Sequence, residues 1–121
     1  MLHKIFVCIC CAAVLVLSAC NKKNTNGIET LSQNEVYFFY QENCPHCHDA
    51  AAYIKEKHPN AKIKSLDIKM PGNKRMFQAA VRSYKVGFGA GTPLICFGEN
   101  YIMGWGETAP QQFDVLVKSY E

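Results

Sequence analysis

The sequence predicts one α/β domain over residues 35–121, with strands and helices in the order βαβαββα. Three observations lead to this fold class. An unbroken run of β-branched and aromatic side chains at residues 35–40 is typical of a strand covered on both faces. Segments with apolar side chains at helical spacing then alternate with strand-like segments. A hairpin signal precedes the last helical segment, which places two strands next to each other near the C-terminus.

The first strand leads directly into Cys44-Pro45-His46-Cys47, a Cys-x-x-Cys motif. Pro45 suits the first position of a helix, where its missing N–H costs nothing. Apolar residues then recur at helical spacing and form one face, which consists of Cys47, Ala50, Ala51 and Ile54. Because Cys44 lies outside this face at the helix start, we expect Cys44 to be exposed and Cys47 to be buried.

The rest of the chain supplies three more strands and two more helices. Residues 62–68 alternate polar with apolar side chains, which is typical of a strand near a sheet edge, and Pro71-Gly72 then breaks the chain. The second helix is indicated by an apolar stripe of Met76, Phe77, Ala80, Val81 and Tyr84. Residues 92–97 and 101–105 flank Gly98-Glu99-Asn100, a hairpin signal.

A third helix is expected at the C-terminus. Residues 108–111 fit a capping box that begins with Thr108 and contains Pro110. The apolar face of this helix is formed by Phe113, Leu116, Val117 and Tyr120. It completes the predicted order of elements.

The N-terminus predicts export and lipid attachment. Lys4 and an apolar run over residues 5–17 resemble a signal peptide, since the run is too short to span a membrane. Residues 17–20, Leu-Ser-Ala-Cys, resemble a bacterial lipobox, in which cleavage leaves Cys20 as the lipidated first residue. We therefore expect a signal peptide at residues 1–19 and a lipid anchor with a flexible polar tether at residues 20–34. A plain secretory signal or an uncleaved anchor is the alternative, and in either case the domain lies outside the cytoplasm, facing the periplasm or the cell exterior.

Charge and cysteine content limit the functions that the domain can have. The formal net charge of +3 predicts no nucleic-acid partner. Of the seven cysteines, the predicted leader and anchor contain four, which leaves Cys44, Cys47 and Cys96 in the domain. This pattern indicates one working pair and one single cysteine, and Cys96, inside an apolar strand, is expected to be a small core residue. His58 at a helix end is expected to be a surface cap.

The motif also has two metal-binding interpretations. Cys44 to His48 matches the Cys-x-x-Cys-His signature of a c-type haem, with His48 as the proximal ligand and Met70 as a second axial ligand. Small c-type cytochromes are helical, however, whereas strands are predicted on both sides of this motif. A zinc site on both cysteines with His46 and His48 is disfavoured, because residues this close cannot all complete one tetrahedron. We expect no metal and no cofactor other than the redox-active Cys44–Cys47 disulfide.

A strand that leads into Cys-x-x-Cys at a helix start, with Thr92-Pro93 opening a later strand, resembles the thioredoxin superfamily. The resemblance is to the smallest, glutaredoxin-like form and covers residues 35–120. It implies a four-stranded mixed sheet flanked by three helices, and a cis peptide bond between Thr92 and Pro93 beside the dithiol. It also implies thiol–disulfide oxidoreductase activity.

The resemblance implies a role for each site residue. Cys44 is the nucleophile, and Cys-x-x-Cys motifs at a helix start have pKa values of about 3.5 to 7.5 instead of about 8.5. His46 adds a donor or a positive charge, and Cys-Pro-His-Cys resembles the site of periplasmic disulfide oxidases. Cys47 resolves the mixed disulfide. The backbone of Thr92, before Pro93, resembles a substrate-binding ledge; the groove walls are expected to be Tyr40 and Phe88.

Two positions depart from the family pattern. Phe38 lies six residues before Cys44, where thioredoxins have a buried acid, so no carboxylate there can take the proton of Cys47. Residues 104–108 match only loosely the glycine and acid pattern with which glutaredoxins hold glutathione, and a glutathione-dependent glutaredoxin is the alternative function. We predict a monomeric, membrane-tethered oxidoreductase of the bacterial cell envelope. Its expected partners are cysteine-containing extracytoplasmic proteins and a redox partner protein.

Overall fold

The structure is a computed structural model and describes residues 31–121, so the predicted signal peptide, Cys20 and residues 21–30 lie outside the described residues. The predicted order of elements is confirmed. The strands are β1 (Val36–Tyr40), β2 (Ile63–Asp67), β3 (Leu94–Phe97) and β4 (Asn100–Met103). The helices are α1 (Pro45–Lys57), α2 (Pro71–Ser83) and α3 (Ala109–Leu116), and a 3₁₀ turn (Val117–Tyr120) follows α3.

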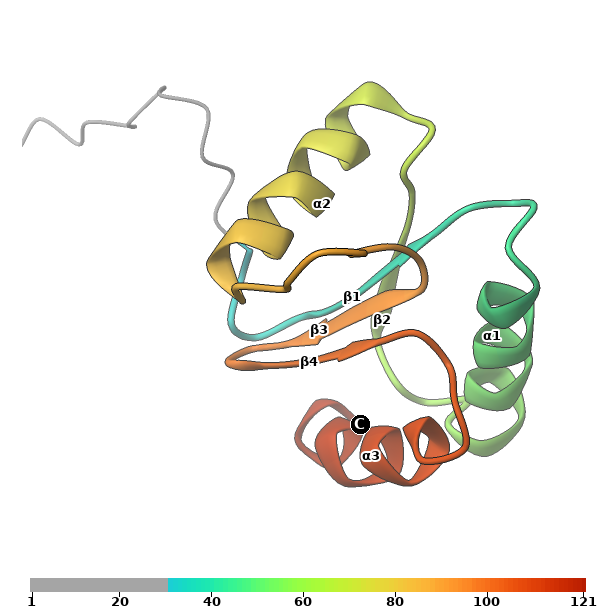
Figure 1. Cartoon of the computed structure of the whole chain (residues 1–121). Helices are drawn as coiled ribbons and strands as arrows, with labels where there is room; N and C mark the ends of the chain where they lie inside the picture. The colour runs from blue at the N-terminus through green and yellow to red at the C-terminus, as the bar shows by residue number, and fades with distance from the viewer. Residues whose placement is uncertain (1–30) are drawn as a thin grey trace, which may run out of the picture.

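The four strands form one mixed sheet in the order β2-β1-β3-β4. Strand β1 runs parallel to β2 and antiparallel to β3, and β4 is antiparallel to β3. Helices α1 and α3 cover one face of the sheet and α2 covers the other (Figure 1). The alternating segment is the edge strand β2, and the unbroken apolar run is the central strand β1, as their patterns predict.

Strand β1 divides the core into two layers. Val36 and Phe38 pack in the layer beneath α1 and α3, whereas Tyr37 and Phe39 pack in the layer beneath α2. Both sets are at most 4% exposed, which explains why the strand shows no polar alternation. Leu31 also packs against the α2 layer, so contacts with the core begin before β1.

The hairpin between β3 and β4 requires glycine at its first loop position. Phe97 pairs with Asn100, so only Gly98 and Glu99 connect the strands. Gly98 has φ +55°, and a Cβ atom there would lie 3.0 Å from the hydroxyl oxygen of Tyr120. Backbone conformation and space therefore both favour glycine.

Two sequence-based details are wrong. Thr108 precedes α3, but its backbone is helical (φ −92°, ψ −10°) instead of extended, and its side chain accepts no hydrogen bond. The capping box therefore does not form, because a capping side chain needs an extended backbone to reach the first turn. Ala51, expected on the buried face of α1, is exposed and lines a cavity instead.

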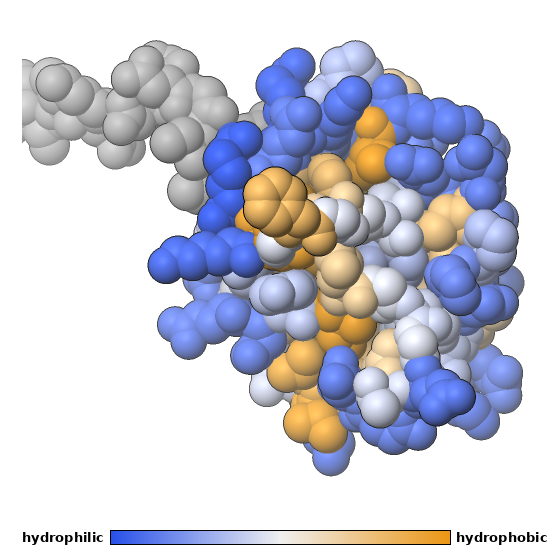
Figure 2. Space-filling view, viewed as in Figure 1, coloured by the Kyte–Doolittle hydropathy of each residue, from blue (hydrophilic) through white to orange (hydrophobic). Residues whose placement is uncertain are grey.

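The face of the domain seen in Figure 2 is hydrophilic around its rim and has several exposed apolar side chains across its centre. The large exposed hydrophobic residues of the described domain are Met70, Phe88, Tyr101, Met103 and Val115. Met70 is the residue before α2, at the turn that joins β2 to α2. Among residues 31–121, every helix is too short or too polar to cross a membrane.

Candidate active site

The cysteine pair lies at the start of α1. Cys44 is the N-cap residue, with an extended backbone (φ −101°, ψ 106°), and Pro45 begins the helix as its pattern predicts. Cys44 and Cys47 form a disulfide with their Cα atoms 5.2 Å apart. The backbone N–H of Cys47 donates to the sulfur of Cys44 at 3.2 Å. The sulfur of Cys44 thus takes the place of the oxygen that usually caps a helix.

The two sulfurs differ in their access to solvent. Cys47 is 3% exposed and packs in the layer beneath α1, whereas Cys44 is half-buried at the edge of that layer. The first turn of α1, which the structure describes in full, carries no acidic side chain. The positive end of the helix therefore faces sulfur and no carboxylate.

Thr92 and Pro93 lie beside the disulfide. The peptide bond between them is cis, as the resemblance implies. The sulfur of Cys44 lies 3.5 Å from the carbonyl oxygen of Thr92, and Pro93 is fully buried. The carbonyl of Pro93 accepts a hydrogen bond from the N–H of Gly104 at 2.8 Å. Two segments far apart in sequence, the start of α1 and the start of β3, thus meet at Cys44.

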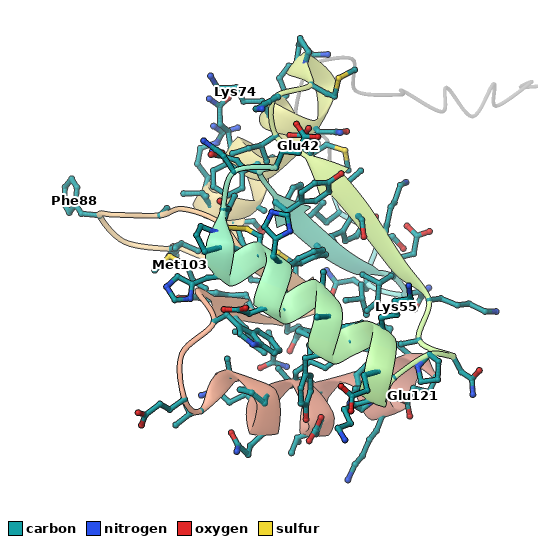
Figure 3. All side chains as sticks on the ribbon, turned by 90° about the vertical axis from the view of Figure 1, so that its right-hand side faces the viewer. Glu42, Lys55, Lys74, Phe88, Met103 and Glu121 are labelled. Carbon is teal, nitrogen blue, oxygen red and sulfur yellow. A yellow bond between two sulfur atoms is a disulfide. The ribbon has the colours of Figure 1, made fainter. Side chains whose placement is uncertain are left out.

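The expected groove walls do not meet at this place. Phe88 is fully exposed and lies between two glycines, and in Figure 3 its ring points away from the rest of the domain. Its proposed place in a groove beside Thr92 is therefore wrong. Tyr40 does line a hollow, but one beside Cys47.

This hollow is an open cavity of about 270 Å³ next to Cys47. Its walls come from β1, the loop after β1, α1 and β2, and they consist of Phe38, Tyr40, Gln41, Glu42, Cys47, His48, Ala51 and Ser65. Phe38 is buried and pairs with Ser65 of the neighbouring strand. Because this residue is a phenylalanine, it supplies no carboxylate to the cavity. Larger hollows of the domain, such as those beside Lys62 and Gln112, are lined by no cysteine.

The two histidines of the motif are both exposed, but only His48 has a fixed partner among the described residues. Its Nε2 lies 2.6 Å from the carbonyl oxygen of Glu42, which can only accept, so Nε2 donates. This bond ties the loop before Cys44 to the first turn of α1. Within residues 31–121, no group of three or more His, Cys, Asp or Glu side chains is arranged to hold a metal ion.

His58 is more than the surface cap expected from the sequence. Its side chain is 12% exposed and lies between Asp114 of α3 and Glu121, with Nε2 2.7 Å from Asp114 Oδ1 and Nδ1 bonded to Glu121. Burial lowers the pKa of His58, but the two carboxylates outweigh this effect and raise the pKa above its ordinary value. The hydrogen bond from His58 in turn lowers the pKa of Asp114, which also accepts from the Tyr53 hydroxyl at 2.9 Å. We call these four residues the His58 cluster.

Cys96 lies on the opposite face of the sheet from Cys47. It is fully buried in the α2 layer and forms no disulfide within residues 31–121. Burial raises the pKa of its thiol to about 12. The environment of Cys96 agrees with the expected core role.

Comparisons with known proteins identify the fold. No protein-family model and no curated protein matches the chain by sequence. Among solved structures, the chain is similar to a glutaredoxin from Archaeoglobus fulgidus, with a TM-score of 0.54 and 18% identity over 70% of this chain and 87% of that one. It is also similar to a buckwheat glutaredoxin in complex with glutathione, with a TM-score of 0.53 and 16% identity over 72% and 76% of the two chains.

A further similar structure is a threonine-to-alanine mutant of a thioredoxin-like protein. Its TM-score is 0.50 and its identity is 19%, over 64% of this chain and 96% of that one. These values describe a shared backbone and not a shared activity. Together with the sheet order β2-β1-β3-β4 and the helices on both faces, they show that the chain has the thioredoxin fold in its four-stranded, glutaredoxin-like form.

Proposed function

We propose that the chain is a thiol–disulfide oxidoreductase that exchanges disulfides with other proteins through Cys44 and Cys47. The observation that carries this proposal is the position of the Cys44 sulfur. It caps a helix start, accepts the N–H of Cys47 at 3.2 Å and is the more accessible sulfur of the pair. Backbone N–H groups and the positive helix end stabilise a thiolate at such a place, and the thiolate is the reactive form.

Exchange proceeds in two steps. The Cys44 thiolate attacks one sulfur of a partner disulfide, and the other partner sulfur leaves as a thiolate. Cys47 then loses its proton and attacks Cys44, which releases the second partner sulfur and closes the Cys44–Cys47 disulfide. Two electrons pass to the partner, and the reverse sequence oxidises a partner dithiol. The direction depends on the reduction potential and the electron partner.

Thr92 supports the binding of a peptide to this site. Its carbonyl group lies 3.5 Å from the sulfur of Cys44, so main chain that pairs with this segment passes next to the reacting sulfur. Extended peptides commonly bind by pairing with exposed main chain, which recognises no particular side chain. We infer that the partners are proteins with cysteines in extended segments.

The proposed compartment is the bacterial cell envelope. The lipobox-like sequence that ends at Cys20 and the polar residues 21–30 support a domain tethered to a membrane by lipid. We propose that this domain is a monomer. Disulfide exchange between secreted proteins takes place in such oxidising compartments. Metabolic labelling with a palmitate analogue tests the anchor: we expect label on the natural chain and none on Cys20→Ser. Equal labelling of both proteins contradicts lipid attachment at Cys20.

Reduction of insulin by dithiothreitol tests the proposed function. The natural protein should accelerate precipitation of the insulin B chain, and Cys96→Ser should match it. Cys44→Ser should be inactive, because the nucleophile is gone. Cys47→Ser should be inactive in turnover but should accumulate mixed disulfides, visible on non-reducing gels. Unchanged activity in Cys44→Ser would refute the proposal.

A glutathione-dependent activity is the second candidate. It is favoured by the similarity to a glutaredoxin that was solved with glutathione. The loop at residues 104–108, Gly-Trp-Gly-Glu-Thr, lacks adjacent glycines. We therefore expect the protein to accelerate the reduction of a glutathione mixed disulfide by glutathione less than it accelerates the reduction of insulin by dithiothreitol. Each acceleration is the ratio of the rates with and without the protein. The opposite ratio favours the glutaredoxin function.

The haem interpretation has a direct test as well. Protein produced in cells with an active cytochrome c assembly system should have the mass of the lipidated polypeptide and no Soret absorption band. In the structure both sulfurs are bonded to each other and His48 is bonded to a backbone carbonyl. A covalent haem on Cys44 and Cys47 would overturn the proposed function.

A further inference from the structure

The exchange steps described above leave one proton without an acceptor. Cys47 must lose its proton before it attacks Cys44, yet Cys47 is 3% exposed, and burial disfavours a thiolate. Phe38 lies beneath this helix start and offers no basic atom. The cavity of about 270 Å³ beside Cys47 offers a route to an acceptor.

His48 is a base on the wall of this cavity. Its Nε2 donates to the carbonyl oxygen of Glu42 at 2.6 Å, so Nε2 carries the proton of the neutral ring. Nδ1 is then the nitrogen with a free lone pair. A water molecule occupies roughly 30 Å³ in the liquid, so the cavity has room for several between Cys47 and the imidazole.

The other groups that line the cavity are weaker candidates. Glu42 supplies the only carboxylate among the lining residues, and this carboxylate is exposed and lies 3.5 Å from Lys69 Nζ. Imidazole is a stronger base than an exposed carboxylate near neutral pH. Tyr40, Gln41 and Ser65 offer a phenol, an amide and a hydroxyl, which are not bases in that range.

We propose that His48 accepts the proton of Cys47, through water in this cavity, when Cys47 attacks the mixed disulfide. This inference rests on the proposed function. The S–H bond of Cys47 breaks and its proton ends on Nδ1 of His48. The electron pair left on sulfur forms the bond to Cys44, and the bond between Cys44 and the partner sulfur breaks, with its electron pair leaving on the partner. The imidazolium then gives its proton to the partner thiolate or to water.

The experiment separates the two sulfur reactions. The reduced protein is mixed with one equivalent of dithiobis(nitrobenzoate), and release of thionitrobenzoate is followed in a stopped-flow instrument. Attack by Cys44 releases the first thionitrobenzoate, and attack by Cys47 on the mixed disulfide releases the second. The rate of the second phase is therefore the rate of the step in which His48 acts.

Two variants separate proton transfer from loop positioning. His48→Gln retains an N–H that can donate to the carbonyl of Glu42 but has no basic nitrogen, and His48→Ala lacks both. We expect the second phase to slow at least tenfold near neutral pH in both, with the first phase unchanged; general bases commonly contribute about 10² to 10⁴. Added imidazole should restore the second phase of His48→Ala in proportion to its concentration. Ser65→Ala changes another side chain that lines the cavity and removes no basic nitrogen, so it is the matched control and should keep a normal second phase.

A normal second phase in His48→Gln would overturn the proposal, because His48 would then act only as a donor to the loop. Equal slowing of both phases, or no rescue by imidazole, would overturn it as well. The insulin assay distinguishes a failure of the proposed function from a failure of the proposed role of His48. A natural protein that releases two thionitrobenzoates but does not reduce insulin contradicts the function and leaves the role of His48 intact.

Discussion

Helix α1 has His46 and His48 near its start and His58 at its C-cap, and His46 and His58 have opposite surroundings. His46 in the first turn is exposed to solvent. His58 at the C-cap is largely enclosed, with Asp114 and Glu121 on its two ring nitrogens. Figure 3 shows the two ends on one helix, with Glu42 near its start and Lys55 and Glu121 near its end.

The difference shows how one helix serves both chemistry and stability. At the C-terminal end of α1, the basic side chains of Lys55, Lys57 and His58 lie near the negative end of the helix dipole and are attracted to it. The carboxylates of Asp114 and Glu121 form ion pairs with the His58 imidazole. At the N-terminal end, the first turn holds no acidic side chain, and the backbone N–H of Cys47 points at a sulfur. The positive N-terminal end of α1 is therefore available to stabilise a thiolate at Cys44. The charges at the C-terminal end are already balanced by neighbouring side chains.

Contacts at the C-terminal end of α1 also hold its N-terminal end in position. The His58 cluster joins the end of α1 to α3 and to the C-terminus, and the rings of Tyr53 and Phe113 both pack against Trp105. The helix therefore cannot shift along the sheet without breaking these contacts. We infer that this anchoring holds Cys44 at its place beside Thr92.

Selective alkylation tests the first end and has the largest expected effect. With limiting iodoacetamide at mildly acid pH, the reduced protein should be labelled on Cys44, and Cys47 and Cys96 should remain nearly unlabelled. Burial raises the pKa of Cys96 to about 12, so almost none of this thiol is ionised near pH 7. Peptide mass spectrometry identifies the labelled cysteine. Preferential labelling of Cys47 would reverse the roles of the two active-site sulfurs.

The His58 cluster is the target of the second test, in which the expected effect is smaller. His58→Gln should lower the free energy of unfolding by about 1–2 kcal/mol near pH 5.5, since bonds to charged groups contribute this much when the partners are partly exposed. Urea unfolding of the oxidised protein measures the loss. His46→Gln, at the other end of the helix, is the control and should change stability little.

The pH dependence of this loss follows from the two pKa shifts. The pKa of His58 is raised in the folded protein, so its contribution is complete below the unfolded value of about 6.5 and is lost as the pH rises through the folded value. The pKa of Asp114 is lowered, so its contribution is present above about 3.9 and is lost as the pH falls through the folded value. The difference between the natural protein and His58→Gln should therefore be largest between about pH 4 and 6.5. A difference that grows toward pH 9 contradicts the ion pairs.

The two ends also differ in how far the sequence predicts them. The site at the start of α1 is local, because Cys44, Pro45 and Cys47 are neighbours whose spacing fixes which sulfur is buried. The strand patterns then predict the sheet, and the resemblance adds Thr92-Pro93. The His58 cluster joins residues 56 and 63 positions apart, and nothing in the sequence pairs them.

Other features missed by the sequence also depend on tertiary contacts. The cavity beside Cys47 exists because Ala51 and Ser65 are small and exposed on neighbouring elements, whereas periodicity places Ala51 on the buried face. Phe88 is an aromatic residue of the kind that lines peptide-binding grooves. The glycines on both sides of it, however, allow a backbone turn that places its ring in solvent. Local pattern therefore predicts the reactive sulfur, and packing between distant segments determines its surroundings.

The smallest expected effect belongs to His46, and it tests whether the first end of the helix makes the dithiol an oxidant. A donor or a positive charge beside Cys44 stabilises the thiolate and therefore the reduced form, because the disulfide has no charge to stabilise. His46→Tyr should make the thiolate less stable and the reduction potential more negative. One pKa unit is about 1.4 kcal/mol, which is roughly 30 mV for a two-electron couple, so the expected shift is some tens of millivolts.

Equilibration with glutathione buffers measures the potential, and the pH dependence of iodoacetamide labelling measures the stability of the thiolate. The backbone N–H of Cys47 and the helix end are unchanged in His46→Tyr, so the thiolate should still form at lower pH than that of a free cysteine. His46→Gln should fall between the two proteins if charge and hydrogen bonding both contribute. An unchanged or less negative potential in His46→Tyr would make His46 an ordinary surface residue, and the reactivity of Cys44 would then depend on the helix start alone.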